Sequence, residues 1–182
     1  MGEVHDRYRR VAGGFTARVE GVAGDQWDAA TPCPDWTVRD LVAHVIGVHR
    51  RAVATVEDAS PPDVDPEGDL VAQWRSASAA VSAAIDDPAR AGSTVRGMFG
   101  EQPFESLVGR LVCADTLFHT WDLARATGQD ERLDPDAVAT ALRYLEPLDD
   151  AIRAPGGFGP KLEPPPGADE QVRLLAFGGR AV

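Results

Sequence analysis

The sequence predicts an all-α protein, a four-helix bundle with short extra helices. Two observations predict this class. Four long stretches repeat apolar side chains at spacings of three and four residues, the period of a helix with one buried face. Their connections are rich in proline, glycine and aspartate, which favour turns. Because 182 residues suffice for one domain with a sizeable core, we expect a single domain over residues 1–182, with the tail, residues 154–182, wrapping the bundle.

The first three helices follow from their apolar stripes. The first is expected over residues 3–22. The second is expected over residues 37–57, where Thr37 as N-cap and Asp40 three residues later resemble a capping box. The third is expected over residues 70–85, after a loop rich in proline and aspartate. All three stripes indicate helices that bury one face.

The second half of the chain begins with a glycine-rich segment in which a minor β-like connection is expected near residues 94–99. The fourth long helix is expected over residues 104–127, with Gly128 as the residue that ends it. A fifth helix is expected over residues 135–148, opened by an aspartate as N-cap and a proline at the first position. A short helical turn is expected near residues 169–177.

The fourth helix is apolar on nearly every side, so it is expected inside the protein. Asp115, His119 and Asp122 lie in its middle, at spacings of four and three, and therefore share one face. A buried carboxylate is costly unless it is paired or bound to a metal. One carboxylate and one imidazole a single turn apart suit a divalent metal such as zinc. A plain hydrogen bond between Asp115 and His119 is the alternative interpretation.

The second helix adds a histidine that points inward. His44 lies within the apolar stripe, between Leu41 and Val48, whereas His49 is expected on the surface. His5, near the start of the first helix, is also expected to be solvated. On its own, His44 could equally be a hydrogen-bonded core residue.

Facing helices of a bundle often supply metal ligands from their inward side chains. His44, Asp115 and His119 would form a set of two imidazoles and one carboxylate, which leaves a coordination position open, as in catalytic zinc sites. Asp122 could accept the second ring N–H of a ligand histidine. The alternative for Asp122 is a bond to Arg125 or to a backbone N–H.

Three further residues that could take part in a site lie beside or within these segments. Cys33, in a proline-rich loop, is expected to be a half-buried thiol rather than a nucleophile, since no base is near it in sequence. Trp36 and Trp121 flank the ligand segments. Either tryptophan could line a pocket, and core packing is the alternative for both.

The composition of the chain excludes some classes of binding partner. The chain has 18 Lys and Arg against 29 Asp and Glu, a net charge of −11. This charge opposes binding to nucleic acid or to anionic membranes, because both require basic patches. No apolar run is long enough to span a bilayer, no apolar leader is visible and two cysteines are too few for a disulfide framework. A cytoplasmic location is therefore expected.

The segments TPCPDWTVRDLVAHVIG and ADTLFHTWDLARATGQD resemble the two hallmark segments of the metal-binding domain of mycothiol-dependent maleylpyruvate isomerase, in the DinB/YfiT-like superfamily of four-helix bundles. The resemblance covers roughly residues 3–150, and the tail resembles the stand-alone proteins of this family. It implies a divalent metal, usually zinc but with nickel or another ion as an alternative, bound by His44, Asp115 and His119.

Two departures limit what the resemblance implies about activity. The isomerase has Glu where this chain has Asp115, and it carries a C-terminal domain with an essential Arg that this chain is too short to contain. One hypothesis is a thiol-dependent S-transferase or isomerase that uses mycothiol, or a similar small thiol, on a small electrophile. The other is a non-catalytic module that binds a metal or a small ligand. For the oligomeric state, both a monomer and a homodimer remain open.

Overall fold

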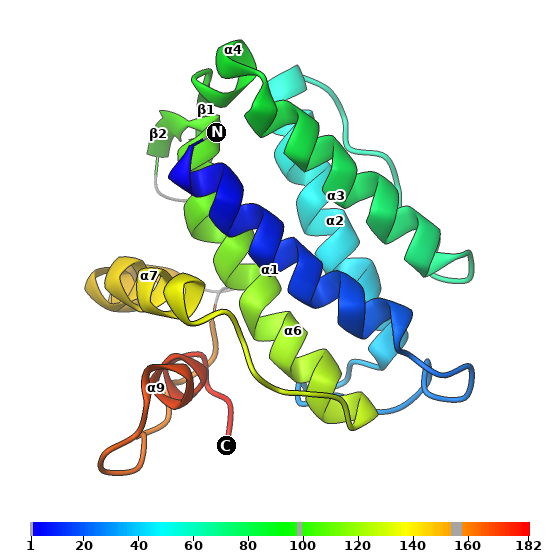
Figure 1. Ribbon diagram of the computed structural model, residues 1–182, viewed down its shortest axis with the longest axis vertical. Helices are drawn as coiled ribbons and strands as arrows, with labels where there is room; N and C mark the ends of the chain where they lie inside the picture. The colour runs from blue at the N-terminus through cyan, green and yellow to red at the C-terminus, as the bar shows by residue number, and fades with distance from the viewer. Residues whose placement is uncertain (1, 98–99, 154–157) are drawn as a thin grey trace.

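The computed structural model describes residues 2–97, 100–153 and 158–182, apart from the side chain of residue 151. Four long helical segments form a bundle in which α1 lies beside α3 and α6, and α2 also contacts both of them. Figure 1 shows α7 and α9 outside this bundle, on the side of α6 away from α3. The predicted all-α class, a helical bundle with short extra helices and a minor β connection, is confirmed.

The first two helices begin and end close to their predicted limits. Helix α1 spans Glu3–Glu20 and α2 spans Val38–Glu57. The predicted capping box is present, because Thr37 accepts a bond from the backbone N–H of Asp40 and the Asp40 carboxylate accepts one from that of Thr37. Since this box fixes where α2 starts, it also fixes which α2 side chains face α6.

The third helix is followed by a small hairpin. Helix α3 spans Leu70–Asp86 and the short α4 spans Pro88–Ala91. Strand β1, Thr94–Gly97, pairs antiparallel with β2, Gly100–Pro103. The β-like connection near residues 94–99 is therefore confirmed for its first four residues, while Met98 and Phe99 lie outside the described residues. The second strand was not predicted.

The fourth long helix contains an irregular turn. Helix α5, Phe104–Leu107, continues through the π-helical turn η1, Val108–Val112, into α6, Cys113–Thr127. Gly109 in this turn lies against α1, where a Cβ atom would come within 3.0 Å of Val4 and Arg7. Gly128 ends α6 in the left-handed conformation, as predicted. The face that carries the polar residues lies entirely within α6.

The chain after α6 forms a second layer against it. Helix α7, Pro135–Leu145, is capped by an aspartate as predicted and passes into the 3₁₀ turn η2, Glu146–Leu148, and the short α8, Asp149–Ile152. Helix α9, Glu170–Phe177, packs on α7. Gly178 then meets the ring of Phe118, with no room for a Cβ atom. This contact brings the end of the chain onto α6.

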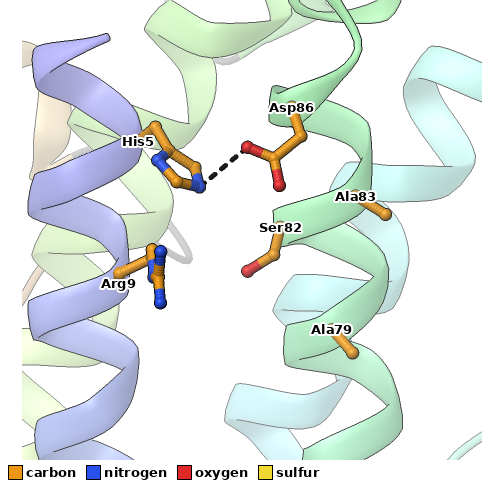
Figure 2. A pocket seen from close by; sticks show the side chains of 6 residues that line it. All are labelled: His5, Arg9, Ala79, Ser82, Ala83 and Asp86. Carbon is orange, nitrogen blue, oxygen red and sulfur yellow. Dashed lines mark ion pairs between the residues drawn. The ribbon is translucent and has the colours of Figure 1, made fainter. Parts of the chain in front are cut away.

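Two histidines lie elsewhere than predicted. His5 is buried rather than solvated, because the start of α1 packs against the end of α3, and its Nε2 lies 2.8 Å from Asp86 Oδ1. This pair lines a hollow of about 480 Å³ between α1 and α3. Figure 2 shows the side chains that line it. His49 is fully buried, because it follows Val45 by one turn on the centre of the apolar stripe.

No helix in the described part of the chain is both long and apolar enough to cross a membrane.

Candidate metal centre

The structure brings together the three predicted ligands from two facing helices. His44 projects from α2, and Asp115 and His119 project from α6. Asp115 Oδ1 lies 3.2 Å from His44 Nε2 and 3.7 Å from His119 Nε2. One ligand atom from each residue lies within 4.8 Å of those of the other two. Atoms bound to a tetrahedral zinc at ~2.0–2.1 Å lie roughly 3.3 Å apart, so the separations around Asp115 suit such an ion.

The second carboxylate oxygen of Asp115 gives an independent test of this fit. Oδ2 is buried and has no hydrogen-bond partner among the described residues. A buried acceptor without a partner is costly and calls for an explanation. The side chains of His44 and Asp115 are 30% and 25% exposed, so the cluster lies near solvent. A divalent cation reaching this cluster would satisfy Asp115, and two imidazoles with a carboxylate are zinc-type ligands.

The other ring nitrogen of His119 meets a second carboxylate. Asp122 is completely buried, and its Oδ2 accepts a bond from His119 Nδ1 at 3.0 Å. Asp122 also receives two bonds from Arg180, in the C-terminal tail. Arg125, the partner considered from the sequence, instead pairs with Glu131. Asp122 therefore orients His119 with Nε2 toward Asp115.

Cys33 lies beside this pair. Its thiol donates to Asp122 Oδ2 at 3.3 Å, and Sγ lies 3.9 Å from His119 Nδ1 and 3.7 Å from Arg180 Nη2. The expectation of a half-buried thiol is correct. No base lies near Cys33 in the sequence, but the fold brings His119 of α6, 86 residues along the chain, next to its thiol. Cys33, His119 and Asp122 form a second cluster of groups able to ligate a metal.

The two tryptophans have different roles. The ring of Trp36 lies 4.7 Å from that of His44 and 5.7 Å from that of His119, so Trp36 covers the cluster. Trp121 is buried in the core, with the Arg125 guanidinium over its ring. Core packing thus describes Trp121, whereas Trp36 is half-buried and lies against His44 and His119.

The charged groups of the cluster shift one another's pKa values toward the charged forms. Burial alone would lower the pKa of His119, but Asp115, Asp122 and Cys33 outweigh it and raise the pKa to about 10. Burial would raise the pKa of Asp115, but the charge of His119 and the bond from His44 bring it below its usual value. Burial opposes the charge on Asp122 too, yet bonds from His119 and Arg180 lower its pKa to about 2. A cation at His119 Nε2 therefore has to replace a proton.

Sequence reasoning missed one part of the cluster. Arg180 follows Asp122 by 58 residues and lies in the tail, whose place on the bundle no local pattern specifies. A weak signal existed: a fully buried Asp122 next to a histidine calls for a compensating positive charge. The chain has 18 Lys and Arg, so this argument could not select Arg180.

Fold and cluster together define a helical bundle with a histidine- and carboxylate-lined candidate metal centre between α2 and α6. The chain belongs to the family described as the mycothiol maleylpyruvate isomerase N-terminal domain, whose model matches residues 8–124. This segment contains every residue of the cluster except Arg180.

Two relatives from Mycobacterium tuberculosis share the full length of the chain. They are the uncharacterized protein MT0763 of strain CDC 1551 / Oshkosh and the uncharacterized protein Rv0738 of strain ATCC 25618 / H37Rv. Each is 33% identical to this chain over 186 residues, and the alignment covers 96% of both sequences. No solved structure shows a significant match.

Proposed function

We propose that the protein binds one divalent metal ion through His44, Asp115 and His119, and that zinc is the preferred ion, with nickel as an alternative. The observation that carries this proposal is the cluster of three ligand atoms around the partly exposed Asp115 carboxylate, whose oxygen Oδ2 is buried and has no hydrogen-bond partner among the described residues. The donor set of two imidazoles and one carboxylate leaves a fourth position for an exogenous ligand.

The partial exposure of His44 and Asp115 supports a position that a small molecule can reach. In the described part of the chain, the other cluster of ligating groups, which contains Cys33 and Asp122, uses the opposite nitrogen of His119. Those two side chains therefore do not close the fourth position on the Nε2 side. Trp36 provides an aromatic surface next to this position.

The family description points to mycothiol as the small thiol that would bind there. A bound metal ion would lower the pKa of a coordinated thiol and so supply a thiolate at neutral pH. In an S-transferase, the sulfur–carbon bond forms as the leaving group departs with its electron pair, and the thiol proton goes to water. In an isomerase, the adduct rearranges and releases the thiol again.

His44, Asp115 and His119 would act as ligands, and Trp36 would contact the bound molecule. The cytoplasm, where small thiols are kept reduced, suits this chemistry.

A non-catalytic module that binds a metal or small ligand is the second candidate. It is favoured by one observation: the polar side chains next to the ligands, Cys33, Asp122 and Arg180, bond to one another. Each is thus already engaged within the protein, and none is an evident general base for a substrate.

The test measures metal content first and thiol chemistry second. Protein expressed with ample zinc and nickel should contain about one divalent ion per chain by elemental analysis, and His119→Ala should contain none. The metal-loaded protein is then screened with mycothiol and a panel of small electrophiles for formation of a thioether or an isomer. Turnover that His119→Ala lacks supports the enzyme. Metal without turnover supports the module. A wild-type protein without metal overturns the proposed metal site, and with it both the enzyme and the metal-binding form of the module.

A further inference from the structure

We propose that Arg180, in the C-terminal tail, is a positioning residue for the metal centre. It holds Asp122, and Asp122 holds His119 with Nε2 toward Asp115. The inference rests on the proposed metal site and deepens it, because it makes the tail part of the site. It also assigns Arg180 a second effect, the exclusion of metal from the neighbouring cluster that contains Cys33.

The geometry of the Arg180–Asp122 pair is that of a two-pronged ion pair. Arg180 Nε donates to Asp122 Oδ1 at 3.1 Å, and Nη2 donates to Oδ2 at 2.7 Å. Asp122 is completely buried and the side chain of Arg180 is 15% exposed, so the buried carboxylate depends on this partner for its compensating charge. A planar guanidinium fixes the plane of a carboxylate through two parallel bonds. Arg180 therefore determines where the oxygen that accepts from His119 lies.

The bond from His119 Nδ1 to Asp122 selects the ring nitrogen that can bind a metal. A ligand histidine commonly donates its second N–H to a carboxylate, which fixes both its tautomer and its ring orientation. Here the hydrogen on Nδ1 is held by Asp122, so the lone pair that a cation can use is on Nε2. Loss of Arg180 would free Asp122 to move and would loosen the His119 ring.

Arg180 also acts on the alternative cluster. Cys33, His119 Nδ1 and Asp122 are together able to ligate a metal, and thiolate, imidazole and carboxylate all bind zinc. The guanidinium lies 3.7 Å from Cys33 Sγ and bonds both oxygens of Asp122. A fixed positive charge at this place repels a cation and occupies the carboxylate. Arg180 thus directs the metal to the Nε2 side of His119.

The tail holds Arg180 in place through contacts that do not involve Asp122. Leu174 and Leu175 of α9 are buried in the core. Gly178 packs against Phe118 so closely that a Cβ atom would lie 2.3 Å from the ring. Arg153 donates to the carbonyl of Phe177 at 2.9 Å. Because these contacts remain when Arg180 is shortened, the tail should stay docked in an Arg180 variant.

The test is a double-mutant cycle on zinc affinity, measured by competition with a chromophoric chelator. Arg180→Met and Asp122→Asn should each weaken binding by about 10- to 100-fold, the range for residues that orient a ligand. The double variant should bind within about threefold of Asp122→Asn alone, because Arg180 acts through Asp122. Arg180→Lys, which keeps the charge but not the two-pronged bond, should be intermediate. If Arg180→Met fails to fold, the zinc affinity of Arg180→Lys tests the inference instead.

The matched control is Arg173→Met, the same substitution in α9, where Arg173 pairs with Glu146 on the surface. It should leave zinc affinity unchanged, and the metal-free melting temperatures of both Met variants are compared. Cobalt provides a second measurement. Cobalt-loaded wild type should show no thiolate-to-metal charge-transfer band, whereas Arg180→Met should show one that Cys33→Ser removes.

Three results would overturn the inference while leaving the metal site standing: an Arg180→Met affinity equal to that of Arg173→Met, losses that add in the double variant, or a thiolate band already present in wild type. A wild-type protein that binds no zinc or cobalt would instead overturn the proposed function, and this inference with it.

Discussion

Helix α2 carries two histidines, and their surroundings differ. His44 and His49 each have a tryptophan ring at 4.7 Å, from Trp36 and Trp74 respectively. His44 is partly exposed and meets the carboxylate of Asp115, while His49 is fully buried and its Nδ1 bonds the backbone carbonyl of Val45. Aromatic contact therefore does not distinguish the two histidines. The carboxylate on the facing helix does, together with the greater exposure of His44.

The two surroundings have opposite electrostatic consequences. Burial lowers the pKa of His49 to about 4, and the bond to Val45 and the charge of Asp115 only partly offset it. His49 Nε2 is buried and has no hydrogen-bond partner among the described residues. On the Asp115 side, the carboxylates raise the pKa of His119 to about 10. The bundle thus keeps one buried histidine neutral and another protonated or bound to a cation.

The largest expected effect comes from removing each α2 histidine in turn. His44→Ala should lose the metal ion, with only a small change in the melting temperature of the metal-free protein, because His44 is partly exposed. His49→Ala should keep about one metal ion per chain but lose roughly 2–4 kcal/mol of stability through the cavity it leaves. Elemental analysis and urea unfolding of the two variants provide the measurements. Loss of metal in His49→Ala alone would reverse the comparison.

A smaller effect is expected from pH. In the unfolded chain, His49 takes up a proton near its ordinary pKa of 6.5. In the folded protein, burial lowers its pKa to about 4, so His49 stays neutral until about that pH. His49 therefore stabilises the fold above pH 6.5, and this contribution is lost as pH falls toward 4, at ~1.4 kcal/mol per pH unit. The loss totals on the order of 3 kcal/mol.

The control for this effect is His49→Gln, which has similar volume and no charge to gain. Unfolding free energies from urea titrations at pH 7.5 and pH 4.5, measured on the metal-free proteins, should fall more for wild type than for His49→Gln. Equal falls in the two proteins would show that His49 does not titrate on unfolding. Carboxylates that titrate in the same range are common to both proteins and cancel in the difference.

The fold could be predicted from the sequence because its signals are local. The stripe and capping box placed α2 at Val38–Glu57, and a glycine marked the end of α6. The π-helical turn η1 could not be predicted, since it depends on how Gly109 packs against α1. His49 was misplaced because the stripe was extended from Val45 to Val48, which is only half-buried. The buried face instead continues from Val45 to His49, one turn further along α2.

The candidate site likewise has a part that local sequence signals predict and a part that they do not. The spacing of Asp115, His119 and Asp122 placed these residues on one face, and the structure shows Asp115 bonded to His44 and His119 bonded to Asp122. Cys33 and Arg180 joined the cluster from a loop and a tail, 86 and 58 residues away from their respective partners on α6. Contacts at such separations are set by the packing of whole elements, and no sequence period encodes them.

The smallest expected effect concerns the tryptophans of the two histidine environments. Trp36 contacts His44 and His119, so a paramagnetic ion bound between them should quench its fluorescence, whereas Trp74 contacts only the core histidine His49 among these three. Cobalt titration of wild type should therefore remove part of the total emission. Trp36→Phe should abolish that decrease yet change cobalt affinity by less than about threefold, because an aromatic ring still covers the ligands and most of the contact is kept. Trp74→Phe, the matched change in the core, should leave the quenched emission unchanged. Quenching that survives in Trp36→Phe and disappears in Trp74→Phe would place the metal beside His49 and refute the distinction between the two histidines.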